Sequence, residues 1–295
     1  MKLYIVPDTG VHITQNVSKY YEMDYNNFVD LIFGSITNNI SIVDDKEQSD
    51  LLVCGIQTLP ETILDKKTML VCVENCSAKG RTHYKHFNLY GHYNDKRISI
   101  HIYNDITKLI VNDDYIAIPF IYLYVDQFIR LQNTLSIPKV PFSEKKFCLF
   151  TSRNSLNDNK MRAIQELVKY GDVDSISNYP EITNKSCYHS KELLKVYSQY
   201  KFVMCFENSH NDGYITEKIF NVFLAGSIPI YDGPSDISKY INTDAVLLFE
   251  DSNFLKKIKL INSNKIVYEH LLNKPKISNN YNNENWSQYL LKFLE

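Results

Sequence analysis

The sequence predicts an α/β fold with two domains, each built on a largely parallel β-sheet. Short apolar runs alternate along the chain with segments whose apolar residues recur at helical spacing, the pattern of α/β architecture. Several runs are apolar on both faces, as strands covered by helices on both sides must be. The 295 residues also suffice for two domains of about 100 to 200 residues each.

The strands are predicted where short apolar runs occur between polar or turn residues. They are Leu3–Val6, Leu51–Gly55, Met69–Val73, Phe147–Thr151, Phe202–Phe206, Ile228–Tyr231 and Val246–Phe249. Helices are predicted where the apolar spacing changes to three and four residues. They are Asn27–Ile36, Lys160–Tyr170, Lys191–Tyr200, Ile215–Ala225, Phe254–Ile261 and Trp286–Leu294.

The pattern breaks near the middle of the chain. The segment Leu135–Glu144 contains Pro138 and Pro141 and few large apolar residues, which indicates a linker between domains. We therefore expect an N-terminal domain over 1–140 and a C-terminal domain over 141–295, with the last helix able to pack back on the first domain. Open α/β sheets bind ligands outside the carboxyl ends of their strands, so the chemistry is expected there.

Composition limits the possible partners. Hydrophobic residues make up 44% and charged residues 22%, which is typical of a globular protein. The 32 lysines and arginines against 34 aspartates and glutamates give a formal net charge of −2, so neither nucleic acid nor an anionic membrane is expected as a partner. No window reaches the length of about 20 apolar residues that a membrane span needs, and we expect a cytoplasmic protein without a transmembrane segment. No cysteine or histidine spacing fits a structural zinc site, and no metal is expected.

The most informative segment is Tyr200–Gly226. It is typical of a buried strand, a polar loop and a helix that ends at Gly226, where glycine can adopt the left-handed C-cap conformation. One stripe of this helix is apolar and is expected to face the core: Ile215, Ile219, Val222 and Phe223. A second stripe is expected to present polar groups: Tyr214, Glu217, Lys218 and Asn221.

The turn before this helix is predicted to bind an anion. Its backbone N–H groups and the positive end of the helix dipole would face the cleft, and Lys218 in the first turn would add charge. Asp212 or Thr216 would cap the helix. In isolation, Glu217 and Lys218 would instead form an ordinary solvated pair.

A second strand-turn-helix segment runs from Phe147 through Asn154 to Arg162. The helix is expected to pack through Met161, Ile164, Leu167 and Val168, which places Arg162 in the first turn, away from that face. A cation there opposes the helix dipole, so a phosphate contact explains Arg162 better than helix stability does. The alternative is a surface arginine.

A third candidate is Glu74, at the end of the apolar run Met69–Val73. A carboxylate at the C-terminal end of a buried strand can act as a general base in the cleft. The alternative is a loop cap. Three other carboxylates remain open as rival bases: Asp24, Asp44 and Asp45.

These residues together resemble a known family. The runs Cys205-Phe-Glu-Asn-Ser209, Tyr214-Ile-Thr-Glu-Lys-Ile219 and Ala225-Gly-Ser-Ile-Pro-Ile-Tyr-Asp-Gly233 are similar to the signature of glycosyltransferase family 10, the α-1,3/4-fucosyltransferases. Thr151-Ser-Arg-Asn154, Arg162 and Tyr170–Ser175 resemble the start of the family's donor domain. The resemblance covers roughly Phe147–Pro234, and Asp232 stands where bacterial relatives tend to carry an aromatic residue.

The resemblance implies a GT-B fold, in which two Rossmann-like domains face each other across a cleft. The N-terminal domain would bind an oligosaccharide acceptor, with a sugar of the GlcNAc or glucose type, and the C-terminal domain would bind GDP-fucose. L-fucose would be transferred with inversion, as an α-1,3 linkage and without an obligatory divalent metal.

Site residues carried over by position fall into two groups. Glu74 would be the general base, and Arg162 and Lys218 would hold the diphosphate. The other donor-side residues would be Asn208, Tyr214, Glu217, Ser152 and Glu207. Glu217 would contact ribose hydroxyls or lie near the developing positive charge. Three alternatives stay open: another nucleotide sugar on the same fold, a glycosidase pairing Glu74 with Glu217, and a catalytically silent carbohydrate- or nucleotide-binding module.

Overall fold

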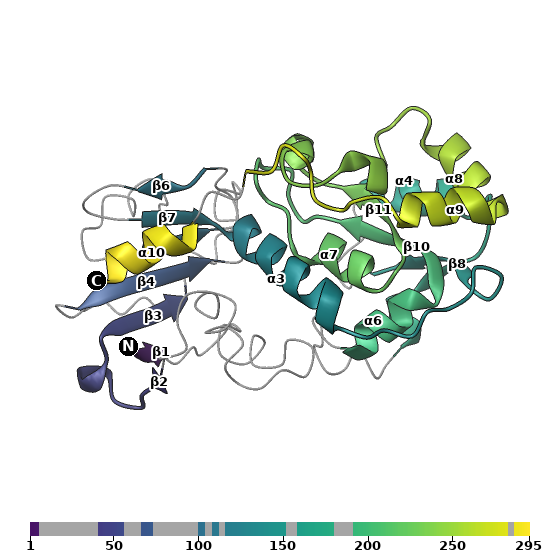
Figure 1. The fold of residues 1–295 in the computed structure, drawn as a ribbon. Helices are drawn as coiled ribbons and strands as arrows, with labels where there is room; N and C mark the ends of the chain where they lie inside the picture. Colours follow the sequence, from purple (N-terminus) through teal and green to yellow (C-terminus); the bar gives the residue numbers. More distant parts are fainter. Residues whose placement is uncertain are drawn as a thin grey trace. The chain divides into compact units, whose positions relative to one another are not determined.

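The computed structural model describes residues 1–5, 41–55, 66–72, 100–103, 108–111, 116–151, 158–179, 191–282 and 286–295 (Figure 1). By its contacts, the chain divides into two compact units. The first comprises Met1–Leu123, Asn211–Tyr214 and Asn283–Glu295, and the second comprises Tyr124–His210 and Ile215–Asn282. Each unit contains its own β-sheet, and the predicted α/β fold class is confirmed.

The first unit is built on a mostly parallel sheet. Its strands are β1 (Lys2–Ile5), β2 (Ser41–Ile42), β3 (Leu51–Gly55), β4 (Lys67–Cys72), β5 (Ile100–Tyr103), β6 (Ile110–Val111) and β7 (Ile116–Pro119). They lie in the order β2-β1-β3-β4-β5-β7-β6, and β6 pairs antiparallel to β7 while the other described pairs are parallel. The C-terminal helix α10 (Trp286–Leu294) packs beside β7 and buries Trp286 (Figure 1).

The second unit is built on a parallel sheet. Its strands are β8 (Lys146–Phe150), β9 (Val173–Ser175), β10 (Tyr200–Phe206), β11 (Ile228–Asp232) and β12 (Leu247–Leu248). Their spatial order is β12-β11-β10-β8-β9, the doubly wound arrangement in which all pairs are parallel and the strand order reverses between β8 and β10. Its helices are α4 (Asp158–Leu167), α6 (Lys191–Ser198), α7 (Glu217–Leu224), α8 (Phe254–Ser263) and α9 (Lys265–Leu272).

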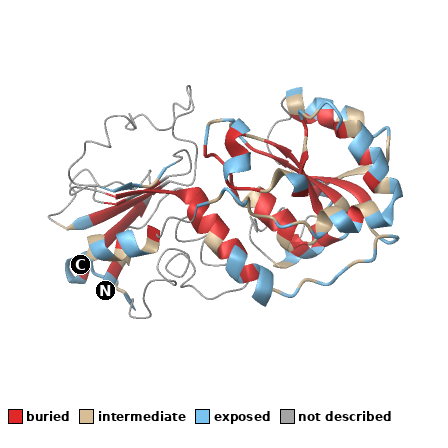
Figure 2. Ribbon diagram, turned by 45° about the horizontal axis from the view of Figure 1, so that its top comes forward, coloured by how far each residue is buried: buried red, intermediate tan, exposed pale blue. Residues whose placement is uncertain are grey.

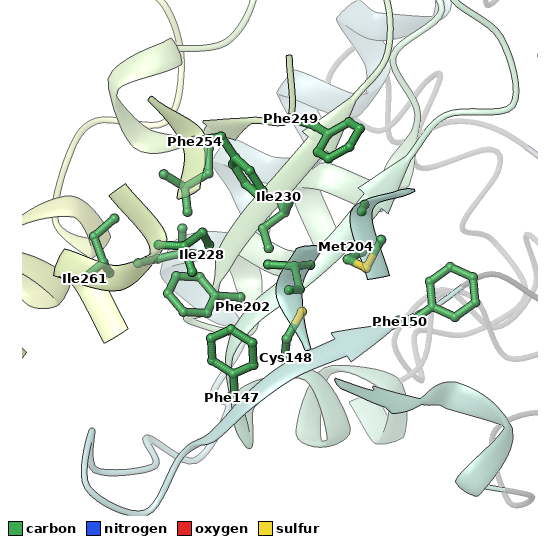
Figure 3. Packing of buried hydrophobic residues seen from close by; sticks show 14 of the residues in the cluster. Phe147, Cys148, Phe150, Phe202, Met204, Ile228, Ile230, Phe249, Phe254 and Ile261 are labelled. Atoms are coloured by element: carbon green, nitrogen blue, oxygen red, sulfur yellow. The ribbon is translucent and has the colours of Figure 1, made fainter. Parts of the chain in front are cut away.

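Helices cover both faces of the second sheet. On one face Phe202, Met204 and Ile230 pack in a cluster with residues of α4, α8 and α9 (Figure 3). Within this cluster the rings of Phe147 and Phe202 meet edge to face, 5.5 Å between centroids. Helices α6 and α7 pack beside β10, and Cys205 Sγ reaches the Lys218 carbonyl at 3.6 Å. The central strands β8, β10 and β11 are therefore largely buried while the outer sides of the helices are exposed, as Figure 2 shows.

Helix α3 (Phe120–Thr134) runs across the division between the units, which falls at Leu123 and Tyr124. Within the second unit, Tyr124 stacks on Phe220 of α7 at 5.9 Å, and Phe128 contacts the same ring at 5.7 Å. The chain then has neither helix nor strand until β8 begins at Lys146. The boundary between the units therefore lies earlier in the chain than the linker predicted around Pro138 and Pro141. The reason is that most of α3 packs on α7 and so belongs to the second unit.

The end of α7 matches its sequence. Gly226 adopts a φ of 67°, in the left-handed region that favours glycine. Its N–H donates to Phe223 O, and the Ser227 N–H donates to Val222 O, both at 3.1 Å. This is a Schellman motif, which satisfies two carbonyls that the helix end would otherwise leave open. The predicted glycine C-cap is therefore confirmed.

The predicted strands all occur, with ends shifted by up to two residues, and the last helix has the predicted bounds. Asn27–Ile36 lies outside the described residues. Among the α-helices and strands of the described residues, those not predicted from the sequence are β2, β5, β6, β7, β9, α3 and α9. Most of these strands are too short to show an alternating pattern of apolar residues. The first half of α3 is buried on almost all sides, so it lacks the polar face that marks a helix in the sequence.

Candidate functional site

The polar groups of the second unit gather at the carboxyl ends of its central strands. Thr151, Glu207 and Asp232 mark the ends of β8, β10 and β11. Helix α4 follows β8 in the chain and α7 follows β10, so both helices begin near the point where the strand order reverses. This edge is where doubly wound sheets bind their ligands.

Glu207 is the centre of a buried hydrogen-bond cluster. Its Oε1 accepts the Thr216 N–H at 2.8 Å, and its Oε2 accepts the Thr216 hydroxyl at 2.8 Å and Lys218 Nζ at 2.9 Å. The Glu207 side chain is 0% exposed, and that of Lys218 is 26% exposed. A buried carboxylate needs such donors, because an ion without them would carry a large desolvation cost.

This cluster fixes the first turn of α7. Thr216 is the N-cap residue by position, but its side chain makes no capping bond, and its hydroxyl also contacts Lys218 Nζ at 2.9 Å. The expectation that Thr216 caps the helix with its own side chain is wrong, because Glu207 occupies that role from the preceding strand. The Thr216 N–H is likewise bonded to Glu207, so this amide is not open to a ligand. The ammonium of Lys218 in the same turn is partly exposed.

The predicted polar stripe of α7 divides into two kinds of position. Glu217 is half-buried and accepts a hydrogen bond from the Tyr124 hydroxyl at 3.2 Å. Tyr214 and Asn221 are buried, so the expectation that the whole stripe presents polar groups is wrong for these two. The apolar stripe is buried as predicted, and α7 packs against β10 and β11. Asn208 is exposed in the loop that follows β10.

Arg162 lies in the second turn of α4, because the helix begins at Asp158 and not at Lys160. Its side chain is 54% exposed and forms an ion pair with Glu250, itself 66% exposed. Its guanidinium also lies over the Phe249 ring, 4.8 Å from the centroid. Arg162 is thus a surface cation with an exposed carboxylate partner.

The buried face of α4 differs from the predicted one. Met161 and Val168 are exposed, and the buried residues are Lys160, Ala163 and Leu167. These three residues follow the helical spacing i, i+3 and i+7. The pattern can be recognised in the sequence only when a lysine is allowed at a buried position. The predicted face is therefore wrong at its two ends, and the lysine was missed because lysines are rarely buried.

Next to Lys160 in the chain, Asn159 reaches across to the end of β11. Its Nδ2 donates to Asp232 Oδ2 at 3.2 Å, and His210 Nε2 lies 3.4 Å from Asp232 Oδ1. Asp232 is only 5% exposed. The pKa of Lys160 is lowered, first by burial and then by the nearby charge of Lys218, while Asp232 acts in the opposite direction. These contacts extend the charged cluster from α7 to α4.

Two predicted site residues, Glu74 and Ser152, lie outside the described residues, as does the rival base Asp24. Of the other rivals, Asp44 is exposed. Asp45 accepts the Glu47 N–H at 3.0 Å and the Gln48 side-chain amide at 3.2 Å, so it acts as the cap of a short turn. Within the described ranges, no three side chains of His, Cys, Asp or Glu gather as a metal site. None of the helices in those ranges is long and apolar enough to cross a membrane.

Comparison with known sequences places this edge within a known domain. Residues 140–289 match the family model "Glycosyltransferase family 10 (fucosyltransferase) C-term". Over 175 residues the chain is 30% identical to the 4-galactosyl-N-acetylglucosaminide 3-alpha-L-fucosyltransferase 9 of Rattus norvegicus and to that of Homo sapiens. Each match covers 57% of this chain and 45% of the relative, so the chain spans less than half the length of these relatives.

Solved structures give the same fold. An α1,3-fucosyltransferase crystal structure aligns with a TM-score of 0.64 at 18% identity, over 99% of this chain and 89% of that one. A second α1,3-fucosyltransferase structure, described with GDP-fucose, aligns with a TM-score of 0.57 at 19% identity, over 100% of this chain and 90% of that one. The family model accounts for half of the sequence and includes β8, β10, β11 and the charged cluster at their ends. The chain belongs to glycosyltransferase family 10, the fucosyltransferases.

Proposed function

We propose that this protein transfers L-fucose from GDP-fucose to a hydroxyl of an oligosaccharide, forming an α-1,3 linkage to a GlcNAc or glucose-type sugar. The observation that carries the proposal is Lys218, which the buried Glu207 and Thr216 hold at the carboxyl edge of the second sheet. This lysine lies in the segment matched by the fucosyltransferase family model. The names of the similar enzymes and the GDP-fucose complex support the donor and the linkage.

The donor side of the reaction is assigned to the second unit. Lys218 stabilises the diphosphate as negative charge develops on it, because an ammonium held in place before the reaction needs no reorganisation. Arg162 approaches the same group from α4. When the donor binds, a phosphate oxygen replaces Glu250 as the partner of its guanidinium. Glu217, fixed by the Tyr124 hydroxyl, contacts the ribose or the fucosyl ring. Asn208 and Ser152 complete the donor contacts.

The acceptor side is assigned to the first unit, with Glu74 as general base. The acceptor oxygen attacks the anomeric carbon of fucose, and the bond from that carbon to the β-phosphate oxygen breaks. The electron pair leaves with GDP, and Glu74 takes the proton of the acceptor hydroxyl. Attack opposite the leaving group inverts the anomeric configuration. With lysine and arginine at the diphosphate, the reaction does not require a divalent metal.

The role of Glu207 follows from its bonds. Both of its carboxylate oxygens accept hydrogen bonds from Thr216 and Lys218. We therefore assign Glu207 to positioning Lys218 and the start of α7, and not to direct contact with the nucleotide.

The test is release of free nucleotide from four donors: GDP-fucose, GDP-mannose, UDP-galactose and UDP-GlcNAc. The assay contains EDTA and a set of disaccharide acceptors with GlcNAc or glucose at the reducing end. We expect acceptor-stimulated release of GDP from GDP-fucose alone. Release from another donor, or a strict need for added metal, would contradict the proposal.

The base is tested with Glu74→Gln, which keeps the size of the side chain and removes its ability to take a proton. We expect GDP binding to be unchanged and transfer to fall by about 100-fold or more. The matched control is Asp45→Asn, which changes a carboxylate that caps a turn. Wild-type turnover in Glu74→Gln would exclude Glu74 as the base.

A further inference from the structure

Tyr231 is a buried tyrosine whose hydroxyl has no role in the assignments above. It lies in β11, next to Asp232, and is 2% exposed. Among the described residues, no group forms a hydrogen bond with its hydroxyl. A buried hydroxyl without a partner costs free energy, and a phenylalanine would fill the same place without that cost. Packing alone therefore does not explain the hydroxyl.

The strand register places Tyr231 on the face of the sheet that α7 covers. Tyr231 pairs with Cys205 of β10, and paired residues of parallel strands point to the same face. Cys205 Sγ contacts the Lys218 carbonyl at 3.6 Å, and α7 packs on both strands. Ile230, which points to the opposite face, packs instead with residues of α4, α8 and α9 (Figure 3). The Tyr231 side chain therefore lies under the helix that carries Lys218.

A glycine brings the hydroxyl to the end of β11, next to Glu207. A Cβ at Gly233 would lie 2.5 Å from the Tyr231 hydroxyl oxygen and 2.6 Å from the ring carbon that bears it, so the phenol takes the place of a side chain at this position. The Glu207 N–H donates to Asp232 O at 2.8 Å, which continues the strand pairing and sets Glu207 beside Gly233. Paired strands are about 5 Å apart, so the hydroxyl lies close to the Glu207 carboxylate without being bonded to it.

The phenol can act as a donor to that carboxylate. Burial raises the pKa of Tyr231, and the charge of Glu207 raises it further, so the hydroxyl keeps its proton. Glu207 already accepts two hydrogen bonds from Thr216 and one from Lys218. When a diphosphate also contacts the Lys218 ammonium, two anions share one cation and repel each other. A further donor to Glu207 would offset this repulsion.

We propose that Tyr231 is a positioning residue of the donor site, whose hydroxyl donates to Glu207 when the diphosphate of the donor binds Lys218. The inference rests on the proposed function and extends it to the face of the sheet beneath α7. The added hydrogen bond keeps the buried carboxylate compensated while Lys218 serves both anions. Gly233 is part of the arrangement, because any side chain there would collide with the phenol.

The first experiment measures the binding of GDP and of guanosine, by calorimetry, to the wild-type chain and to Tyr231→Phe. We expect GDP affinity to fall by about 10-fold, the effect of one hydrogen bond to a charged group. Guanosine has no diphosphate and should bind both proteins equally. The matched control is Tyr200→Phe, which removes a buried hydroxyl bonded to Asp174 at 2.6 Å and should bind GDP like wild type.

Urea denaturation separates this role from a structural one and needs no ligand. We expect Tyr231→Phe to be at least as resistant to urea as wild type, because it removes a buried hydroxyl that no described group satisfies. In Lys218→Ala, Glu207 has lost its ammonium and the hydroxyl becomes its donor, so adding Tyr231→Phe there should lower the urea midpoint. Tyr200→Phe should lower the midpoint equally in both backgrounds.

Two binding results would overturn the role of Tyr231 and leave the proposed function intact: equal GDP affinity in Tyr231→Phe and wild type, or equal weakening of GDP and guanosine. A lower urea midpoint in Tyr231→Phe alone would do the same, because it would mean that an ordered water already satisfies the hydroxyl. So would an unchanged midpoint when Tyr231→Phe is added to Lys218→Ala. Failure of the wild-type chain to bind either GDP or GDP-fucose would overturn both.

Discussion

Two ion pairs near the carboxyl edge of the second sheet use similar chemistry in different surroundings. At the start of α7, Lys218 is bonded to a carboxylate with no exposed surface. In the second turn of α4, Arg162 is bonded to Glu250, and more than half of each side chain is exposed. The buried pair is part of the fold and fixes one ammonium in place. The exposed pair contributes little to stability, so its arginine can change partner at little cost.

The largest effect is expected from breaking the buried pair at its carboxylate. Glu207→Ala removes the acceptor of three hydrogen bonds and leaves the Thr216 N–H and Lys218 without it. We expect the free energy of unfolding to fall by about 3 kcal/mol, as measured by urea denaturation. A loss no greater than that in Glu250→Ala would show that burial does not distinguish the two pairs.

The next effect concerns the cation of the same pair. Lys218→Ala should lower kcat/KM for GDP-fucose by about 100-fold, since it removes one preorganised group that stabilises the leaving diphosphate. Lys257→Ala, a lysine bonded to Asp251 on the exposed side of α8, serves as control and should keep wild-type kinetics. The account of the donor site would be wrong if both variants had the same kcat/KM.

A smaller effect is expected at the far end of α7, the helix that carries the cation of the buried pair. Gly226→Ala forces a side chain into a φ of 67° although a new Cβ would meet nothing within 4 Å, so the cost is purely conformational. We expect about 1 kcal/mol of lost stability, and a smaller loss in Gly226→Asn because asparagine tolerates this conformation better. Thermal unfolding of the two variants measures the difference, and an equal loss in both would contradict this explanation.

The smallest effect is expected at the exposed pair. Glu250→Gln should change the free energy of unfolding by less than about 0.5 kcal/mol, because exposed ion pairs contribute little. The KM for GDP-fucose should not rise, since Arg162 is released for the phosphate. A clear rise in KM would mean that Glu250 positions Arg162 for the donor and that the exposed pair is as organised as the buried one.

Sequence alone predicted the elements whose burial follows a regular pattern. Strand β10 is apolar on both faces and α7 has one clean apolar stripe, so each shows its type in the pattern. Helix α3 does not, because Phe120 to Val125 are all buried and the polar face that marks a helix is missing.

The site could be predicted only in part, for a related reason. The motif identified Lys218 and Glu217 and their place at the start of a helix. It could not show that Glu207 caps that helix, because the contact joins the end of a strand to a residue nine positions later. Nor could it show that Lys160 is buried, since the burial of a charged residue depends on packing between elements that the sequence pattern does not reveal.

The central claim is that the carboxyl edge of the second sheet is the donor site. The most direct measurement is a crystal structure of the full chain grown with GDP. The account predicts phosphate oxygens within hydrogen-bond distance of Lys218 Nζ, at the ends of β8 and β10. GDP bound at another place, with Lys218 in contact only with Glu207 and Thr216, would contradict it.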